Sequence, residues 1–247
     1  MKHLIGSKAS RLIAFLLTAV ILLCAVPSST AADAPRFWYN DAQDARLKAL
    51  DCLMTCAFSI EYSGSATGSS SALTRWEKPI WIYMGGSATS DDRDQLNKFI
   101  MDIATHCPNM PNIRLASREQ DANIVIWYCP LNEMYKHVDG YHEGNWGYFS
   151  YNYNSANNMT GAKIAIASDK NNTASKRHLL REELMGSFGL TNDHYDYSDS
   201  ILYGEWTTVE QLSEVDWLML NMLYDPDLQC GTSASRAYDV LRAKILK

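Results

Sequence analysis

One short segment of the chain concentrates the side chains that could carry out acid–base or metal chemistry. Between residues 178 and 194 it holds two histidines, two adjacent glutamates and an Asn-Asp pair that follows a glycine. Carboxylates can serve as general bases, and both carboxylates and imidazoles bind divalent metals. The candidate site residues are therefore His178, Glu182, Glu183, Asn192, Asp193 and His194.

The spacing of these residues limits what they can do together. Adjacent helical positions diverge by about 100°, so Glu182 and Glu183 should not both face one metal ion, and one of them should be solvated. His178 stands four residues before Glu182 and shares its helix face. A metal site rearranged around His178, Glu182, Asp193 and His194 is one interpretation. Histidines that are solvated or hydrogen-bonded at the surface are the other, which the sequence favours.

The order of these residues resembles the active-site helix of the zincin metallopeptidases. In the metzincin pattern two histidines four apart on a helix bind zinc, and a glutamate beside the first is the general base. A glycine then turns the chain so that a third ligand reaches the metal. Anchoring the comparison on Gly189 places Glu182 at the first histidine and Glu183 at the general base. Gly186 then stands at the second histidine and Asn192 at the third ligand.

Over residues 75–232 the chain resembles more closely an uncharacterised family of exported bacterial zincin-like proteins. The signature of that family is Glu-Glu-Leu, a Gln four residues after the first Glu, Gly-Leu, Asn-Asp, Ser-Ile-Phe and Leu-Tyr-Asp-Pro. Matching residues stand at 182–184, 189–190, 192–193, 200–201 and 223–226. The sequence departs from the signature at Gly186 and Leu202.

The resemblance also implies roles for the surrounding segments. Residues 122–126 look like the family's edge-forming strand, and residues 162–167 like the strand before the active-site helix. Ser200-Ile201 stands where the turn beneath the metal would lie. Residues 208–224 resemble the closing helix of matrixin-type domains. The fold class implied is α+β, with a zincin-like mixed sheet, a central active-site-type helix and C-terminal helices.

The departures from the zincin pattern argue against catalytic zinc. Glycine has no ligand atom, Asn192 is a poor zinc ligand, and Glu182 replaces an imidazole with a carboxylate. Asn192-Asp193 could equally hold the C-terminal turn of the helix. We therefore expect no metal in the zincin pattern and no resident cofactor, with zinc bound only if a rearranged set of ligands forms.

Three interpretations of function follow. The favoured one is a non-catalytic binding or envelope-associated module that has lost the histidine zinc ligands and has an unknown protein or peptide partner. The second is a peptidase-like hydrolase with a rearranged metal or acid-based site, in which Glu183 is the general base. The third is a secreted domain that shares only its architecture with zincins. A binding role would depend on the aromatic segment 141–153.

Hydrophobic periodicity predicts the elements that must position these residues. Strands are expected at residues 79–84, 113–115, 122–129 and 161–168. Residues 63–71 should form a flexible Gly/Ser-rich loop, and residues 141–158 an irregular, partly extended surface segment. The helix at 208–224 is capped in this prediction by Thr208 with Gln211. The full set of expected helices is 41–59, 90–107, 176–189, 208–224 and 235–246.

The first residues predict export. Basic residues at 2, 8 and 11 precede an apolar run of 15 residues, 12–26, which Pro27 and a group of small residues end. A bilayer span needs roughly 20 apolar residues, so the segment is typical of a cleaved signal peptide. We expect a signal peptide over 1–32, an N-terminal helix and loop over 33–74, and a zincin-like domain over 75–247. The mature protein should be periplasmic or secreted, without a membrane span.

Composition narrows the partners and the cysteine chemistry. Removal of the three positive charges of residues 1–32 moves the formal net charge from −6 to −9, which argues against a nucleic-acid partner. Cys107 closes a predicted helix and Cys129 a predicted strand, and these two form the favoured disulfide. Export permits bridges among the five cysteines that remain: Cys52, Cys56, Cys107, Cys129 and Cys230.

Overall fold

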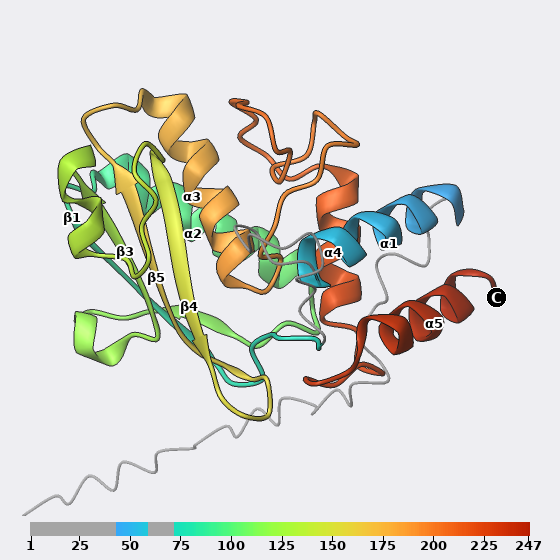
Figure 1. The fold of residues 1–247 in the computed structure, drawn as a ribbon. Helices are drawn as coiled ribbons and strands as arrows, with labels where there is room; N and C mark the ends of the chain where they lie inside the picture. The colour runs from blue at the N-terminus through green and yellow to red at the C-terminus, as the bar shows by residue number, and fades with distance from the viewer. Residues whose placement is uncertain (1–42, 59–71) are drawn as a thin grey trace, which may run out of the picture.

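The computed structural model describes residues 43–58 and 72–247, so the expected signal peptide and the expected loop at 63–71 lie outside the described residues. The described chain has the expected α+β character, with helices packed around one five-stranded sheet (Figure 1). The strand order is β2-β1-β3-β5-β4. The strands are β1 (Ile80–Gly86), β2 (Ile113–Leu115), β3 (Ile124–Cys129), β4 (Gly147–Tyr153) and β5 (Met159–Ala167).

Four strands are parallel, and β4 alone runs antiparallel, paired with β5 at one edge of the sheet. The prediction that residues 122–126 form the edge strand is wrong, because β3 pairs with β1 on one side and β5 on the other. Its unbroken apolar run suits a central parallel strand, which is covered on both faces. The edge is formed instead by β4, which lies within the segment expected to be irregular.

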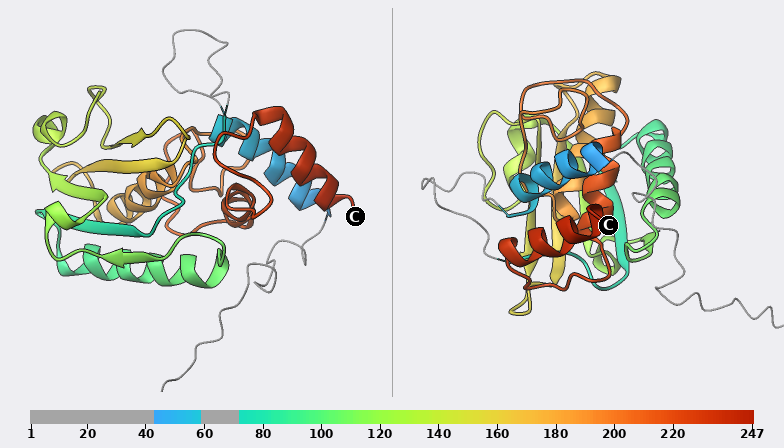
Figure 2. Two further views of the ribbon diagram at one scale, coloured as in Figure 1. Left: turned by 90° about the horizontal axis from the view of Figure 1, so that it is seen from below. Right: turned by 90° about the vertical axis from the view of Figure 1, so that its right-hand side faces the viewer.

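Two groups of helices flank the sheet (Figure 2). On one face α2 (Ser90–His106) lies beside α3 (Thr173–Ser187), and Arg177 of α3 pairs with Asp91 of α2 at 3.0 Å. Beyond the sheet α1 (Gln43–Phe58) packs against α4 (Glu214–Leu223) and α5 (Ala234–Ile245). Short 3₁₀ turns occupy Glu119–Asp121 and Leu131–Lys136. Within the described residues, no helix combines the length and apolar character that a membrane crossing requires.

The helix predicted at 208–224 begins six residues later, at Glu214, so the expected capping box of Thr208 and Gln211 is wrong. Ser213 caps the helix instead. Its side chain accepts a hydrogen bond from the backbone N–H of Asp216 at 3.3 Å, and the Asp216 carboxylate accepts one from the backbone N–H of Ser213 at 2.8 Å. In the sequence alone, Thr208 with Gln211 and Ser213 with Asp216 both have the pattern of a capping box.

Contacts with α3 explain why residues 208–212 stay outside the helix. The carbonyl oxygen of Val209 lies 2.7 Å from Nδ1 of His178, and Glu210 pairs with Arg177 at 3.1 Å. These two contacts hold residues 209 and 210 against α3. The tertiary contacts therefore move the helix start to the second capping sequence.

Side chains of the sheet alternate between two cores. Ile124 and Ile126 of β3, with Ile164 of β5, point to the main core on the side of α2 and α3. Cys129 and the alternate residues of β5 point to a smaller cluster on the other face, beneath the turn that holds Met134. The period of two along a strand produces this division.

The two cores also decide the disulfide prediction. The described cysteines all have free thiols, so the expected Cys107–Cys129 bridge is not formed. Cys107 ends α2 inside the main core, where its thiol donates to the Leu220 carbonyl oxygen at 3.7 Å. Cys129 points into the smaller cluster. The sheet separates the two thiols, whereas a bridge requires Cα atoms within about 7 Å.

Arg75 joins the segment before β1 to the end of α4. Its side chain is buried, and its guanidinium donates to the carbonyl oxygens of Leu223 (2.7 Å), Asp225 (3.1 Å) and Leu228 (2.9 Å). The last carbonyls of a helix lack intrahelical donors. Arg75 therefore satisfies the C-terminal end of α4 and the turn that follows it.

We predict that Arg75→Ala lowers the free energy of unfolding by about 3 kcal/mol, because three buried carbonyl oxygens lose a charged donor. Arg75→Lys should recover only part of the loss, since an ammonium lacks the planar fork of the guanidinium. Urea unfolding measures both. Arg118→Ala, which removes an exposed ion pair with Asp121, is the control and should have little effect on the free energy of unfolding. An equal effect of the two alanine variants would contradict this role.

Candidate functional site

A cleft lies between the edge strand β4, the helix α3 and the loop that follows α3. It consists of two adjoining pockets, and Gly147, Glu182, Glu183 and Asp193 line both. The structure thus brings together three of the carboxylates that the sequence singled out. None of the residues that line the two pockets is a lysine or an arginine. The cleft is therefore acidic.

Glu183 lies against the backbone of β4 at Gly147. Glu183 is only 7% exposed. A Cβ added to Gly147 would lie 2.3 Å from Oε1 of Glu183. Any larger residue at position 147 would displace the carboxylate. The sequence analysis did not single out Gly147. The signal was present, because a glycine between two aromatic residues of a strand often marks a place where another group approaches the backbone closely.

Gly186 stands at the second zinc histidine in the zincin comparison, and the ring of Phe149 covers it. A Cβ added to Gly186 would lie 2.5 Å from Cε1 and 2.7 Å from Cζ of Phe149. The ring in turn stacks on Tyr151, with centroids 6.1 Å apart. An aromatic side chain of β4 therefore fills the space that a ligand side chain would need, and the residues present do not fit zinc in the zincin pattern.

His178 and Glu182 form an ion pair along α3. Nε2 of His178 lies 3.2 Å from Oε2 of Glu182, and Nδ1 lies 2.7 Å from the Val209 carbonyl oxygen. Burial of the ring lowers the pKa of His178, but the hydrogen bond and charge of Glu182 and the Val209 carbonyl outweigh it, so the pKa is raised. Both ring nitrogens lie against oxygen atoms, and this arrangement favours the protonated form of the ring.

Gly189 ends α3 in the turn that the sequence predicts. It adopts φ +120°, and a Cβ there would lie 2.6 Å from the carbonyl oxygen of Thr74. Only glycine tolerates both conditions. The turn sends the chain back along α3 toward the cleft.

Two predicted site residues in this loop lie away from the cleft. Asn192 is buried, and its backbone and side-chain N–H groups donate to the Cys56 carbonyl oxygen of α1 at 3.0 and 3.3 Å. His194 is 1% exposed, with Nε2 3.0 Å from Oγ of Ser200. Neither lines a pocket of the cleft. Asp193, and not Asn192, faces the place where the resemblance put a third ligand.

The rearranged metal site around His178, Glu182, Asp193 and His194 does not form. Within residues 43–58 and 72–247, the one group of three metal-binding side chains with mutually close ligand atoms is Cys52, His194 and Asp196. His194 therefore belongs to a different cluster from His178. The cleft itself keeps Glu182, Glu183 and Asp193 together with His178.

With this geometry established, the chain can be compared with known families. A family model described as "Protein of unknown function (DUF2927)" matches residues 48–243. The chain belongs to this family. The matched region begins within α1 and ends within α5, so it includes the whole cleft and the part of α1 that contains Cys56. No curated protein matches the chain.

We predict that Gly186→Ala destabilises the protein, although alanine is favoured over glycine in a helix by about 1 kcal/mol. Its Cβ would overlap the Phe149 ring, and overpacking of this kind costs about 1–3 kcal/mol. In a Phe149→Ala background the same substitution should stabilise, because only the helix propensity remains. A double-mutant cycle from urea unfolding measures the difference. The same effect in both backgrounds would rule out the contact.

The raised pKa of His178 predicts a pH dependence with a definite sign. A group whose pKa is higher in the folded protein than its ordinary value, here 6.5, adds most to the free energy of unfolding below pH 6.5. This contribution to stability is lost as the pH rises through the folded pKa. The stability advantage of wild type over Glu182→Gln should therefore be larger at about pH 6 than at about pH 8. The NMR titration midpoint of His178 should also fall in Glu182→Gln. An unchanged midpoint would show that the ion pair does not set it.

Proposed function

We propose that this protein is an exported, zincin-like domain that has lost the metallopeptidase zinc site and binds extended basic peptide segments along β4. The observation that carries the proposal is the cleft, with an edge strand on one side and carboxylates of α3 and its loop on the other. Export rests on the N-terminal segment of the sequence.

The zincin-like fold is supported by the contacts among the segments that carry the resemblance. The helix α3 packs against β4 and β5 and ends at the Gly189 turn. Ser200 and Ile201 are fully buried, and both donate hydrogen bonds to the carboxylate of Asp216 in α4, at 2.6 and 3.0 Å. The helix, the turn and the closing helix therefore follow one another in the implied order, while β4 takes the role of edge strand.

Loss of zinc is supported by what occupies each ligand position. The Phe149 ring covers Gly186, and the Asn192 side-chain amide donates a hydrogen bond to α1. The Glu182 carboxylate pairs with His178. Each position is thus committed to packing or to a hydrogen bond within the chain. These contacts favour a binding function over zinc-dependent catalysis for this cleft.

The edge strand supports an extended peptide as the ligand. Every second residue of an edge strand has its N–H and C=O groups directed away from the sheet. An extended peptide can pair with those groups and add a strand, while its side chains enter neighbouring pockets. Phe149 and Tyr151 of β4 line the cleft and supply apolar surface beside that edge.

The charge and aromatic content of the cleft support a basic peptide. Glu183, Asp193 and Glu205 line it, and carboxylates form strong charge-assisted hydrogen bonds with lysine and arginine. Tyr195 and Trp206, which line the same part, are 70% and 58% exposed. Exposed aromatic faces attract guanidinium and ammonium groups. A peptide with alternating basic and apolar residues matches these features.

A second candidate, an acid-based hydrolase, is favoured by one observation. Glu183 is buried while Asp193 lines the same cleft, and two carboxylates in one cleft can provide a general base and a general acid. Mass spectrometry of peptides incubated with the protein distinguishes the two functions. Cleavage that is lost in Glu183→Gln would favour the hydrolase, whereas intact peptide that stays bound would favour the binding domain.

We predict that the protein, expressed from residue 33 and purified without metal-affinity resin, binds an extended peptide of alternating arginine and valine residues. Fluorescence anisotropy measures the binding. Glu183→Gln and Asp193→Asn should each weaken it about tenfold, because a hydrogen bond between charged groups contributes about 1.5–3 kcal/mol. Glu119→Gln, at an exposed acid of a distant 3₁₀ turn, should leave it unchanged.

Two peptide variants separate backbone pairing from charge. A peptide methylated at alternate backbone nitrogens should bind more weakly, because it cannot donate to the carbonyl groups of β4. A peptide with glutamate in place of arginine should not bind. Equal binding of the arginine and glutamate peptides, or binding of neither, would overturn the proposal.

A further inference from the structure

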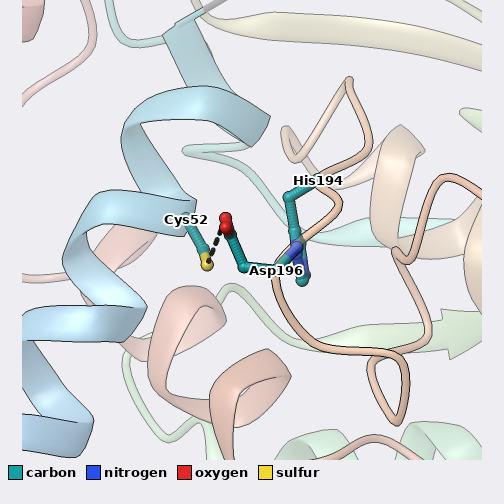
Figure 3. A group of neighbouring side chains, drawn as sticks. All are labelled: Cys52, His194 and Asp196. Carbon is teal, nitrogen blue, oxygen red and sulfur yellow. Dashed lines mark hydrogen bonds between the residues drawn. The ribbon is translucent and has the colours of Figure 1, made fainter.

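Outside the cleft, three metal-binding side chains meet where α1 contacts the loop after α3. Cys52 lies on α1, and His194 and Asp196 lie on the loop (Figure 3). Each residue offers a ligand atom within 4.8 Å of those of the other two, and Sγ of Cys52 lies 3.9 Å from Oδ2 of Asp196. Cys52 and His194 are each 1% exposed, whereas Asp196 is exposed. The cluster is therefore buried on one side and open to solvent on the other.

The hydrogen bonds of His194 show which ring nitrogen carries the proton. Oγ of Ser200 donates to Oδ1 of Asp216 at 2.6 Å and accepts from the backbone N–H of Leu202 at 3.0 Å. Its one proton is thereby used, so at the 3.0 Å contact with Nε2 of His194 it can only accept. Nε2 is protonated, and Nδ1 keeps its lone pair.

A second contact agrees with this assignment. The backbone N–H of Asp196 donates to Nδ1 of His194 at 3.3 Å, which requires a lone pair on Nδ1. The hydrogen bond is long, and it places the lone pair on the side of Asp196. A neutral imidazole with one unprotonated nitrogen is the form of histidine that binds metals, and an ion at Nδ1 would replace this long hydrogen bond.

We propose that Cys52, His194 and Asp196 bind a divalent transition metal and that zinc is the ion that fits best. Zinc is borderline-soft and accepts sulfur, nitrogen and carboxylate ligands together, with water at a fourth tetrahedral position. Ligand atoms about 2.0–2.3 Å from such an ion lie about 3.5 Å from one another. Side-chain rotations that bring the three ligand atoms about 1 Å closer complete the site, and water reaches it past the exposed Asp196.

The surroundings of His194 are those that a metal-binding histidine requires. Ligand histidines donate their other ring N–H to a fixed acceptor, which orients the ring. Here the chain from Nε2 through Ser200 ends on the buried carboxylate of Asp216, which also accepts hydrogen bonds from Ile201 and Ser213. The acceptor is thus held in place by α4, independently of the metal.

A bound ion would connect α1 to the loop between α3 and α4. That loop is otherwise joined to α1 through Asn192 and the Cys56 carbonyl oxygen. Because a ligand that binds only the folded state stabilises it, the metal should raise the melting temperature. This site is separate from the peptide cleft, and its test does not depend on peptide binding.

The experiment uses the mature protein, stripped with a chelator and then titrated with Zn²⁺ alone in competition with a chromogenic chelator. One zinc per chain should bind, and the melting temperature should rise. Co²⁺ in place of zinc should give a thiolate-to-cobalt charge-transfer band in the near ultraviolet, which reports a cysteine ligand. Zinc should also protect the Cys52 thiol from alkylation.

Variants assign the ligands. Cys52→Ala should abolish the cobalt band and weaken zinc binding by at least about tenfold, while Cys56→Ala, at a buried thiol one turn along the same helix, should preserve both. Asp196→Asn changes an exposed side chain and should weaken zinc binding even if Cys52→Ala does not fold. Ser200→Ala, which removes the acceptor for His194, should cost about 10–100-fold in affinity.

Three results would overturn the proposed metal site. They are the absence of zinc binding by the stripped protein, a cobalt complex without the thiolate band, or a band that survives Cys52→Ala. Zinc binding that Asp196→Asn and Cys52→Ala both leave unchanged would place the ion elsewhere on the chain.

Discussion

The close approach of α3 to β4 determines the shape of the cleft, and two glycines make that approach possible. Gly147 on the strand leaves room for the carboxylate of Glu183 on the helix, and Gly186 on the helix leaves room for the ring of Phe149 on the strand. Each element thus inserts a side chain at the other's glycine. The arrangement places one carboxylate at the cleft, and it fills the space beside Gly186 with the Phe149 ring. The shape of the acidic cleft and the filled space at Gly186 therefore have one structural cause.

The carboxylate of Asp216 organises the other side of the cleft. It is fully buried and accepts hydrogen bonds from Ser200, Ile201 and both donor groups of Ser213. Burial raises the pKa of Asp216 above its ordinary value, and these hydrogen bonds offset only part of that rise. By starting α4 and fixing the turn at 200–201, Asp216 positions the loop that carries Asp193 and His194. A residue far from the cleft surface thereby controls which side chains face it.

Local patterns predicted most elements, because apolar periodicity reports burial directly. The failures occur where a distant contact decides between equivalent local signals. Thr208 and Ser213 both begin a plausible capping sequence, and the contacts of residues 209–210 with α3 select the second. Cys107 and Cys129 were paired in the prediction because one ends a helix and the other ends a strand. The sequence did not show that they face opposite sides of the sheet. The direction of Asn192 likewise depends on a distant contact, its hydrogen bond to α1.

The loop after Gly189 shows why counting residues to a third ligand was insufficient. His194 bridges to Tyr203 in an extended conformation, and successive side chains of extended backbone point to opposite sides. Asn192 and His194 consequently face α1, while Asp193 between them faces the cleft. Three consecutive residues thus serve two different surfaces. The peptide bond between Asp193 and His194 therefore joins the acidic cleft to the cluster around Cys52.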